Sequence, residues 1–109
     1  MQSVLNDSNR HKYNPTNERI IKKYLEHVRR TKLADDKTLL AMHKYLRSFE
    51  VLTDFQNLDR YNPDMAKTCL ANLRKKTLSP SYMYRIVSEA QKFIRWLADE
   101  PMGRRIHRN

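Results

Sequence analysis

A single glycine, Gly103, among 109 residues is the feature that most restricts what this chain can fold into. Glycine most readily adopts the backbone conformations required by tight β-hairpins and by loops that wrap phosphate groups. The sequence is therefore poorly suited to most β architectures and to nucleotide-cradling loops. Hydrophobic residues make up 39% of the chain, which is enough for a core and too much for a disordered basic tail. We expect an all-α protein with one domain.

Cysteine content and hydropathy narrow the class of protein further. The only cysteine, Cys69, cannot form an internal disulfide, and a lone cysteine is not a zinc site. We therefore expect no metal and no cofactor. No apolar run approaches the roughly 18 residues that span a membrane, and the start of the chain lacks the apolar core of a signal peptide. These features predict a cytoplasmic protein that does not act in a membrane.

Four amphipathic segments are predicted to be helices, and each begins with a residue that can cap a helix. They are 14–30, capped by Asn14 or Thr16; 33–52, with Asp35 or Asp36 at its start; 62–76, capped by Asn62; and a helix within 75–97, capped by Ser79. Their apolar stripes are predicted to consist of Ile20, Ile21, Tyr24, Leu25 and Val28; Leu39, Met42, Leu46 and Phe49; Met65, Cys69, Leu70 and Leu73; and Met83, Ile86, Val87, Ala90, Phe93, Ile94 and Leu97.

The second and fourth helices carry apolar residues at the same offsets from their caps. This similarity fits generic amphipathicity and also fits two similar helical hairpins. We expect a compact four-helix bundle of two hairpins, with room for a short fifth helix in the connector at 53–61, where Phe55 and Leu58 pack inward. Residues 1–13 are interpreted as a flexible lead-in, 14–100 as the domain, and 101–109 as the start of a linker.

Basic residues gather on the outward faces of the second and fourth helices. The chain has 22 Lys and Arg against 12 Asp and Glu, a formal charge of +10. Residues 19–47 hold nine basic and three acidic side chains and 67–98 hold seven and one, whereas 53–66 hold one and three. The outward residues are Lys37, Lys44, Arg47 and Ser48 on the second helix, and Ser81, Arg85, Ser88, Lys92 and Arg95 on the fourth.

This charge pattern favours nucleic acid as a partner. One basic face could be an ordinary solvated helix surface, but two such faces and the net charge favour a polyanion, because a basic surface gains by releasing the counterions of duplex DNA. A membrane surface is a weaker candidate, because a bundle would bury the apolar faces that such a helix needs. If DNA is the partner, we expect the protein to be associated with the nucleoid in the cytoplasm.

Several residues give the chain a family resemblance. The pattern Leu78-Ser79, a helix, then Phe93-Ile94-x-Trp96-Leu97 resembles the end of the core-binding domain of tyrosine recombinases, the phage-integrase family. Residues 20–52 are similar to the first hairpin of that domain, with Thr38 and Phe49 at characteristic places, and residues 58–73 to its third helix and the preceding connector. The resemblance covers about residues 17–100.

The resemblance implies a SAM-like helical bundle that forms one jaw of a clamp around double-stranded DNA at a recombination half-site. A separate catalytic domain would follow, and the full-length protein would meet other recombinase protomers on DNA, whereas this domain alone would be a monomer. Asp35 stands where the family often has serine, and Tyr82 where it usually has threonine. The implied DNA-facing residues are Lys37, Thr38, Ala41, Lys44, Ser81, Tyr82, Arg85 and Ser88, with Lys75, Lys76, Lys92 and Arg95 nearer the phosphates.

No catalytic set is expected in this chain. His27 and Arg30 match the family's His-x-x-Arg box by letter only, because they lie on the first helix and the other catalytic members belong to a second domain. His43 and His107 lack partners at metal-ligand spacing and are interpreted as surface histidines. Two alternatives stay open, a basic helical protein-interaction domain with an acidic partner and a helix-turn-helix regulator. Against the latter, no short glycine-containing turn precedes a recognition helix.

Overall fold

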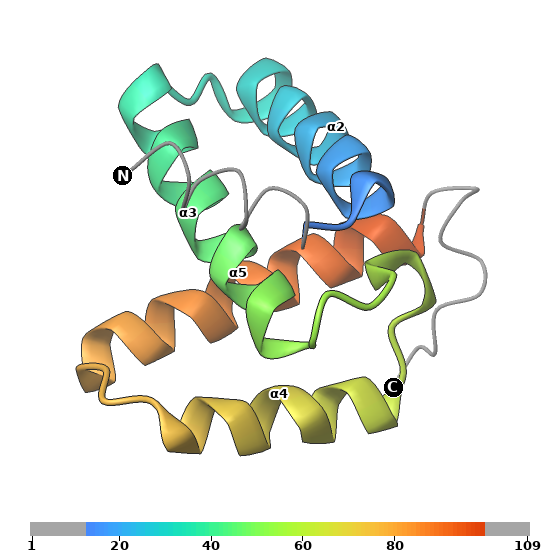
Figure 1. The fold of residues 1–109 in the computed structure, drawn as a ribbon. Coiled ribbons are helices and arrows are strands. Elements are labelled where there is room, and N and C mark those ends of the chain that lie inside the picture. The colour runs from blue at the N-terminus through green and yellow to red at the C-terminus, as the bar shows by residue number, and fades with distance from the viewer. Residues whose placement is uncertain (1–12, 100–109) are drawn as a thin grey trace, which may run out of the picture.

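Four α-helices and one 3-10 helix make up the regular structure of residues 13–99, the part of the chain that the computed structural model describes (Figure 1). This all-α architecture confirms the predicted fold class. The segment interpreted as a lead-in, except for its last residue Tyr13, and the segment interpreted as a linker lie outside the described residues. In chain order the elements are α2 (Pro15–Lys32), α3 (Asp36–Leu52), η1 (Leu58–Arg60), α4 (Pro63–Lys75) and α5 (Pro80–Ala98).

Each α-helix begins with a side chain that satisfies a free backbone N–H group. Asn14 accepts a hydrogen bond from the Thr16 N–H at 2.9 Å, so Asn14 and not Thr16 caps α2. Asp35 caps α3 by accepting from the Thr38 N–H at 2.9 Å. The other two caps are Asn62 on α4 and Ser79 on α5. Local sequence therefore fixes all four helix starts, because a cap contacts only the first turn of its own helix.

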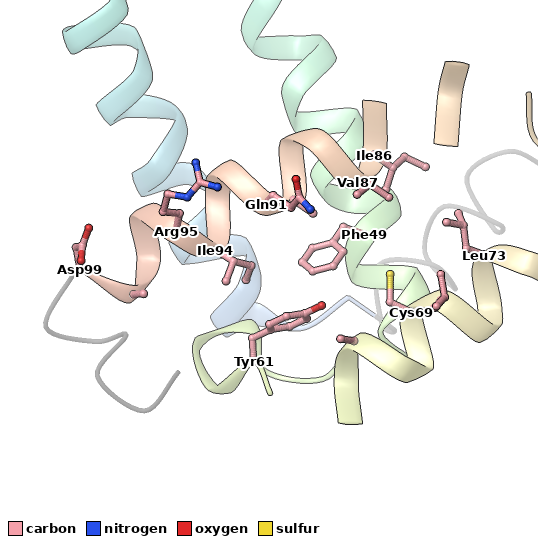
Figure 2. Close-up of a pocket in the computed structure, with 14 residues that line it drawn as sticks. Phe49, Tyr61, Cys69, Leu73, Ile86, Val87, Gln91, Ile94, Arg95 and Asp99 are labelled. Carbon is pink, nitrogen blue, oxygen red and sulfur yellow. The ribbon is translucent and has the colours of Figure 1, made fainter. Parts of the chain in front are cut away.

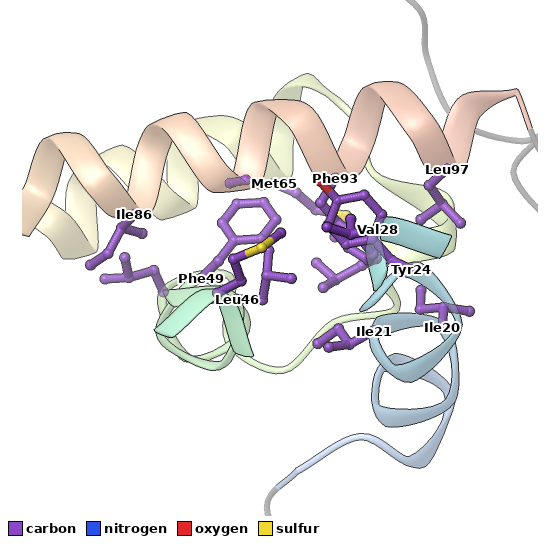
Figure 3. Close-up of a cluster of buried hydrophobic side chains, with 14 of the residues drawn as sticks. Ile20, Ile21, Tyr24, Val28, Leu46, Phe49, Met65, Ile86, Phe93 and Leu97 are labelled. Carbon is purple, nitrogen blue, oxygen red and sulfur yellow. The ribbon is translucent and has the colours of Figure 1, made fainter. Parts of the chain in front are cut away.

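Helix α3 occupies the centre of the bundle and packs against α2, α4 and α5. Its most extensive packing is with α5. The stripe residues Leu46, Phe49 and Phe93 are among the most buried side chains of the core that these helices share (Figure 3). From the connector, Leu58 is fully buried, as predicted, because η1 turns it inward between α2 and α5.

Helices α4 and α5 diverge, so the predicted pair of similar hairpins is only half realised. Helix α4 packs more closely on α3 than on α5. Two predictions of burial are therefore wrong: Leu70 is 49% exposed and Val87 is 38% exposed. Both side chains lie on the apolar stripe of their helix, but no helix covers them in the described part of the chain. Cys69 and Ile94 are half-buried for the same reason.

A buried polar network joins the start of α2 to the end of α3. The side chains of Asn17 and Glu50 are both fully buried, and the Asn17 amide donates to Glu50 Oε2 at 3.1 Å. Asn17 also donates to the carbonyl of Gln56 and accepts from the Leu58 N–H at 2.8 Å. One asparagine thereby holds the connector against α2, which fixes where η1 and α4 begin.

Tyr13 and Asn14, at the start of the described residues, pack against the connector and the end of α3. The backbone N–H of Asn14 donates to Glu50 Oε2 at 2.8 Å, and the side-chain amide of Asn14 donates to the Phe55 carbonyl. Tyr13, which we assigned to the lead-in, contacts the Phe55 ring edge-on and stacks with the Arg47 guanidinium at 4.4 Å. These contacts tie Tyr13 to the connector and to α3.

The described helices include none that is long and apolar enough to cross a membrane.

Replacing Asn17 with alanine tests the buried network. The variant loses three hydrogen bonds and leaves the Leu58 N–H without its acceptor, so we expect unfolding to become easier by about 2–4 kcal/mol. The melting temperature should fall by roughly 10–20 °C for a domain of this size. Gln91→Ala, at an exposed position of α5, is the control and should melt like the parent protein. Equal melting of the two variants would contradict the role given to Asn17.

Candidate nucleic-acid interface

The predicted contact residues of α3 all lie on its outer surface. Lys37, Thr38, Ala41 and Lys44 are exposed. The Asp35 cap places Lys37 and Thr38 in the first turn of α3, and the hydrogen bond from the Thr38 N–H holds the pKa of Asp35 below its usual value. The helix therefore begins with an anionic cap, followed by a row of cationic and small side chains.

Arg47 does not belong to this exposed row, contrary to our prediction. Its side chain is 15% exposed and pairs with Glu50 Oε1 and with Glu18 Oε1, each at 2.7 Å. The buried carboxylate of Glu50 requires a cation, because an unpaired charge in a core is costly. Arg47 is therefore a structural residue and leaves Lys37 and Lys44 as the exposed lysines of α3.

Helix α5 presents two unlike flanks beside its buried stripe. At about 100° per residue, Arg85 and Lys92 fall on one flank, and Val87 and Ile94 fall on nearly the opposite one. Arg85 and Lys92 are exposed, as is Ser81, whereas Ser88 is half-buried. The basic flank and the apolar flank of α5 therefore lie on two different surfaces of the domain.

Tyr82 joins the outer face of α3 to the basic side of α5. Its ring meets the Tyr45 ring edge-on with centroids 5.5 Å apart, and the Lys44 ammonium lies 5.4 Å from the Tyr82 centroid. Both rings are half-buried. The outer side of α3 and the start of α5 therefore adjoin at Tyr82. We use the name α3–α5 face for the two aromatic residues of this junction and the candidate contact residues of the two helices: Lys37, Thr38, Ala41, Lys44, Tyr45, Ser81, Tyr82, Arg85, Ser88 and Lys92.

A buried carboxylate lies next to this face. Glu89 is 8% exposed, its Oε2 is 3.9 Å from Lys92 Nζ, and its Oε1 has no hydrogen-bond partner among the described residues. Burial, and then the charge of Glu89, raise the pKa of Tyr24 on α2 to about 12. The negative charge of Glu89 therefore offsets part of the positive charge of Lys92.

Three further predicted phosphate contacts are not among the residues of the α3–α5 face. Lys75 is in the last turn of α4 and Lys76 is its C-cap, and both are exposed. Arg95 is exposed near the end of α5, where it borders an apolar groove together with Asp99 (Figure 2). The contacts at Tyr82 thus bring α3 together with the start of α5, whereas Arg95 lies in the last turn of α5.

The residues considered for catalysis or metal binding are not gathered into one site in the described part of the chain. His27 is half-buried with its ring 5.7 Å from that of Trp96, while Arg30 is exposed. His43 is half-buried; burial, and then the nearby Arg47 charge, lower its pKa. His107 lies outside the described residues. Within residues 13–99 no group of three or more His, Cys, Asp and Glu side chains could hold a metal ion.

Sequence reasoning missed the turn that leads to this surface. Tyr45 is half-buried and packs against the core as well as against the Tyr82 ring. The turn between α2 and α3 is made by Leu33 in the left-handed conformation (φ 52°) with 87% of the residue exposed. Glycine is the usual residue at such a position, so the sequence carried no signal for this short turn.

Comparisons of the chain with models of protein families, with curated proteins and with solved structures found no match.

Alanine substitution of two tyrosines on α5 tests the junction. Tyr82→Ala removes an aromatic contact and a cation–π contact between helices, so we expect a loss of about 1–2 kcal/mol in unfolding free energy. Tyr84, two residues further, is 71% exposed, and Tyr84→Ala should change this free energy by less than about 0.5 kcal/mol. Chemical denaturation measures both variants, and a loss confined to Tyr84→Ala would refute the junction.

Proposed function

We propose that this chain is a domain that binds double-stranded DNA, with the α3–α5 face as its contact surface. One observation supports the proposal: Lys44 of α3 lies over the ring of Tyr82 of α5, so two helices that both carry exposed cations, Lys44 and Arg85 among them, adjoin there. Such a face offers positive charge to phosphates from two directions. Its small and hydroxyl side chains, Thr38, Ala41 and Ser81, leave room for base edges between the cations.

The resemblance to the core-binding domain of tyrosine recombinases gives this proposal its finer form. In that form the domain grips a recombination half-site, with α3 and α5 in the major groove, while a separate catalytic domain cuts and rejoins the strands. The charge distribution supports it, since residues 53–66, which include η1, are acidic on balance and residues 67–98 are basic. In this form of the proposal the domain contributes DNA binding, and the chemistry belongs to the catalytic domain.

Two alternative functions predict different partners or different contact residues for the same surface. A protein-interaction domain would direct the α3–α5 face at an acidic partner, and its affinity for DNA would not exceed that for any polyanion. A helix-turn-helix regulator would read DNA with α3 alone, after the short turn at Leu33, so that Arg85 on α5 would contribute little. The experiments below separate these functions.

Titration of duplex DNA at several salt concentrations tests the electrostatic part of the proposal. With about four to six phosphates neutralised, log K should fall against log salt with a slope of roughly −4 to −5. Binding should be micromolar or weaker, because one jaw of a clamp makes only part of the contacts. Heparin of matched charge serves as the competitor, and equal affinity for heparin and DNA would favour the acidic-partner alternative. An affinity for DNA that is indifferent to salt would exclude the proposed contacts.

Charge reversal on both helices tests the surface itself. Lys37→Glu with Arg85→Glu replaces two exposed cations, one on each helix, and leaves Lys92 paired with Glu89. Affinity for DNA should fall by about tenfold or more, because two attractions to phosphate become repulsions. Each exposed change should alter the unfolding free energy by less than about 0.5 kcal/mol.

Lys22→Glu with Lys67→Glu is the matched control for net charge. Both lysines are exposed, on α2 and α4, outside the α3–α5 face. The control should lose much less affinity than the test pair. If both pairs weaken binding equally, the affinity for DNA depends on net positive charge and not on the α3–α5 face, and the proposed surface is wrong. Arg85→Glu alone separates the helix-turn-helix alternative, which predicts an unchanged affinity.

A further inference from the structure

The diverging helices α4 and α5 leave an apolar groove on the side of α5 opposite its basic flank. Its volume is about 700 Å³ (Figure 2). The groove is lined by Leu70 and Leu73 of α4 and by Val87 and Ile94 of α5, together with Tyr61 and Cys69. Leu70 is 49% exposed and Val87 is 38% exposed, which is unusual for stripe residues of amphipathic helices. Covering these side chains would remove apolar surface from water, so a segment that packs here would be stabilised.

We propose that the occupant is residues 101–109 of the same chain, with Met102 and Ile106 as the apolar side chains that enter the groove. The sequence after α5, Pro101-Met-Gly-Arg-Arg-Ile-His-Arg-Asn109, carries these two large apolar residues four positions apart among polar ones. The proposal does not depend on DNA binding, because the groove and the α3–α5 face use different flanks of α5.

The position at which the described chain ends supports this choice. Ala98 and Asp99, the last described residues, themselves border the groove. The ten residues that follow could extend over at most about 33 Å. The α5 residues that line the groove, Ile86 to Asp99, span roughly 20 Å of helix, so the segment can turn back and reach its whole length. Gly103, the only glycine, stands where such a reversal would be made.

Charge complementarity supports the same occupant. The start of α4 lies at the same end of the bundle as the end of α5, on the right of Figure 1. Two acidic residues lie at this end: Asp59 is in η1, just before α4, and Asp64 is in the first turn of α4. Asp59 Oδ1 is buried without a hydrogen-bond partner among the described residues. Arg104 and Arg105 would bring guanidinium groups to this acidic end when Met102 and Ile106 fill the groove.

A segment of the same chain also has a concentration advantage over any external partner. Linked through Asp99, it meets the groove at an effective concentration in the millimolar range. Weak contacts by two side chains then suffice to keep the groove filled. A second copy of the chain would have to match this concentration in solution, which gives the two occupants different signatures in an experiment.

Cys69 provides a probe within the groove. It is the only cysteine, it lines the groove, and it is half-buried with its pKa raised by burial. In the full chain, a docked segment 101–109 should shield this thiol from a chromogenic aromatic disulfide. Met102→Asp with Ile106→Asp should release the segment and increase the labelling rate of Cys69 about fivefold or more. The matched control, His107→Asp with Asn109→Asp, adds the same two charges to the same segment and should label like the parent.

The reciprocal experiment changes the groove and reads the segment. Leu70→Glu places a charge in the groove, so trypsin should cleave after Arg104 and Arg105 faster than in the parent chain. Ala71→Glu, at the next and exposed position of α4, does not line the groove and is the control. Circular dichroism confirms that each variant keeps its helices before rates are compared.

The outcomes decide the proposal in either direction. Faster Cys69 labelling in the Met102 and Ile106 variant, with rates independent of protein concentration, supports docking of the segment in its own groove. Labelling that slows as protein concentration rises would assign the groove to a second copy of the chain and overturn the proposal. Unchanged labelling in that variant, with unchanged trypsin cleavage in Leu70→Glu, would also overturn it. None of these results depends on whether the domain binds DNA.

Discussion

The carboxylate of Glu50 is the group on which the arrangement of the helices depends. It is fully buried near the end of α3, where it accepts hydrogen bonds from the Asn14 backbone, from the Asn17 side chain and from Arg47. A buried charge is tolerated only when it is fully paired, so its partners must be held in place for the domain to fold. Through Asn17 the same network holds Leu58 and the connector. The start of α2, the end of α3 and the position of η1 are therefore set together.

This internal use of charge determines which cations remain for a partner. Arg47 forms ion pairs with Glu50 and Glu18, and Glu89 lies 3.9 Å from Lys92. These two cations are therefore less available to bind a partner than the other basic residues of α3 and α5. Lys37, Lys44 and Arg85 are exposed on the α3–α5 face without such a carboxylate partner among the described residues. The proposed DNA contact thus depends on the packing of α3 against α5, which brings the two helices together at Tyr82.

Helix α5 links the two surfaces proposed for this domain. Its buried stripe, with Phe93 fully buried, anchors it to the core, while its basic and apolar flanks face different directions. The connector held by Asn17 leads into α4, and the four-residue turn from Lys76 to Ser79 returns the chain to α5. The helices diverge from that turn, so α5 keeps an apolar flank that neither α3 nor α4 covers. The groove and the α3–α5 face are consequences of one helix packed on one side only.

The sequence by itself determined the helices and their caps, because a cap or a Pro at the first helical position acts within one turn of chain. It also predicted most of the core and most of the exposed candidates, since periodicity places residues on a helix face. Only the tertiary structure decided which faces meet. Leu70 and Val87 occupy positions that the helical pattern predicts to be buried, but they are exposed. Arg47 occupies a position that the pattern predicts to be exposed, but its side chain is largely buried in an ion pair with Glu50. Burial and pairing depend on what another element brings opposite a side chain, and periodicity within one helix carries no information about that.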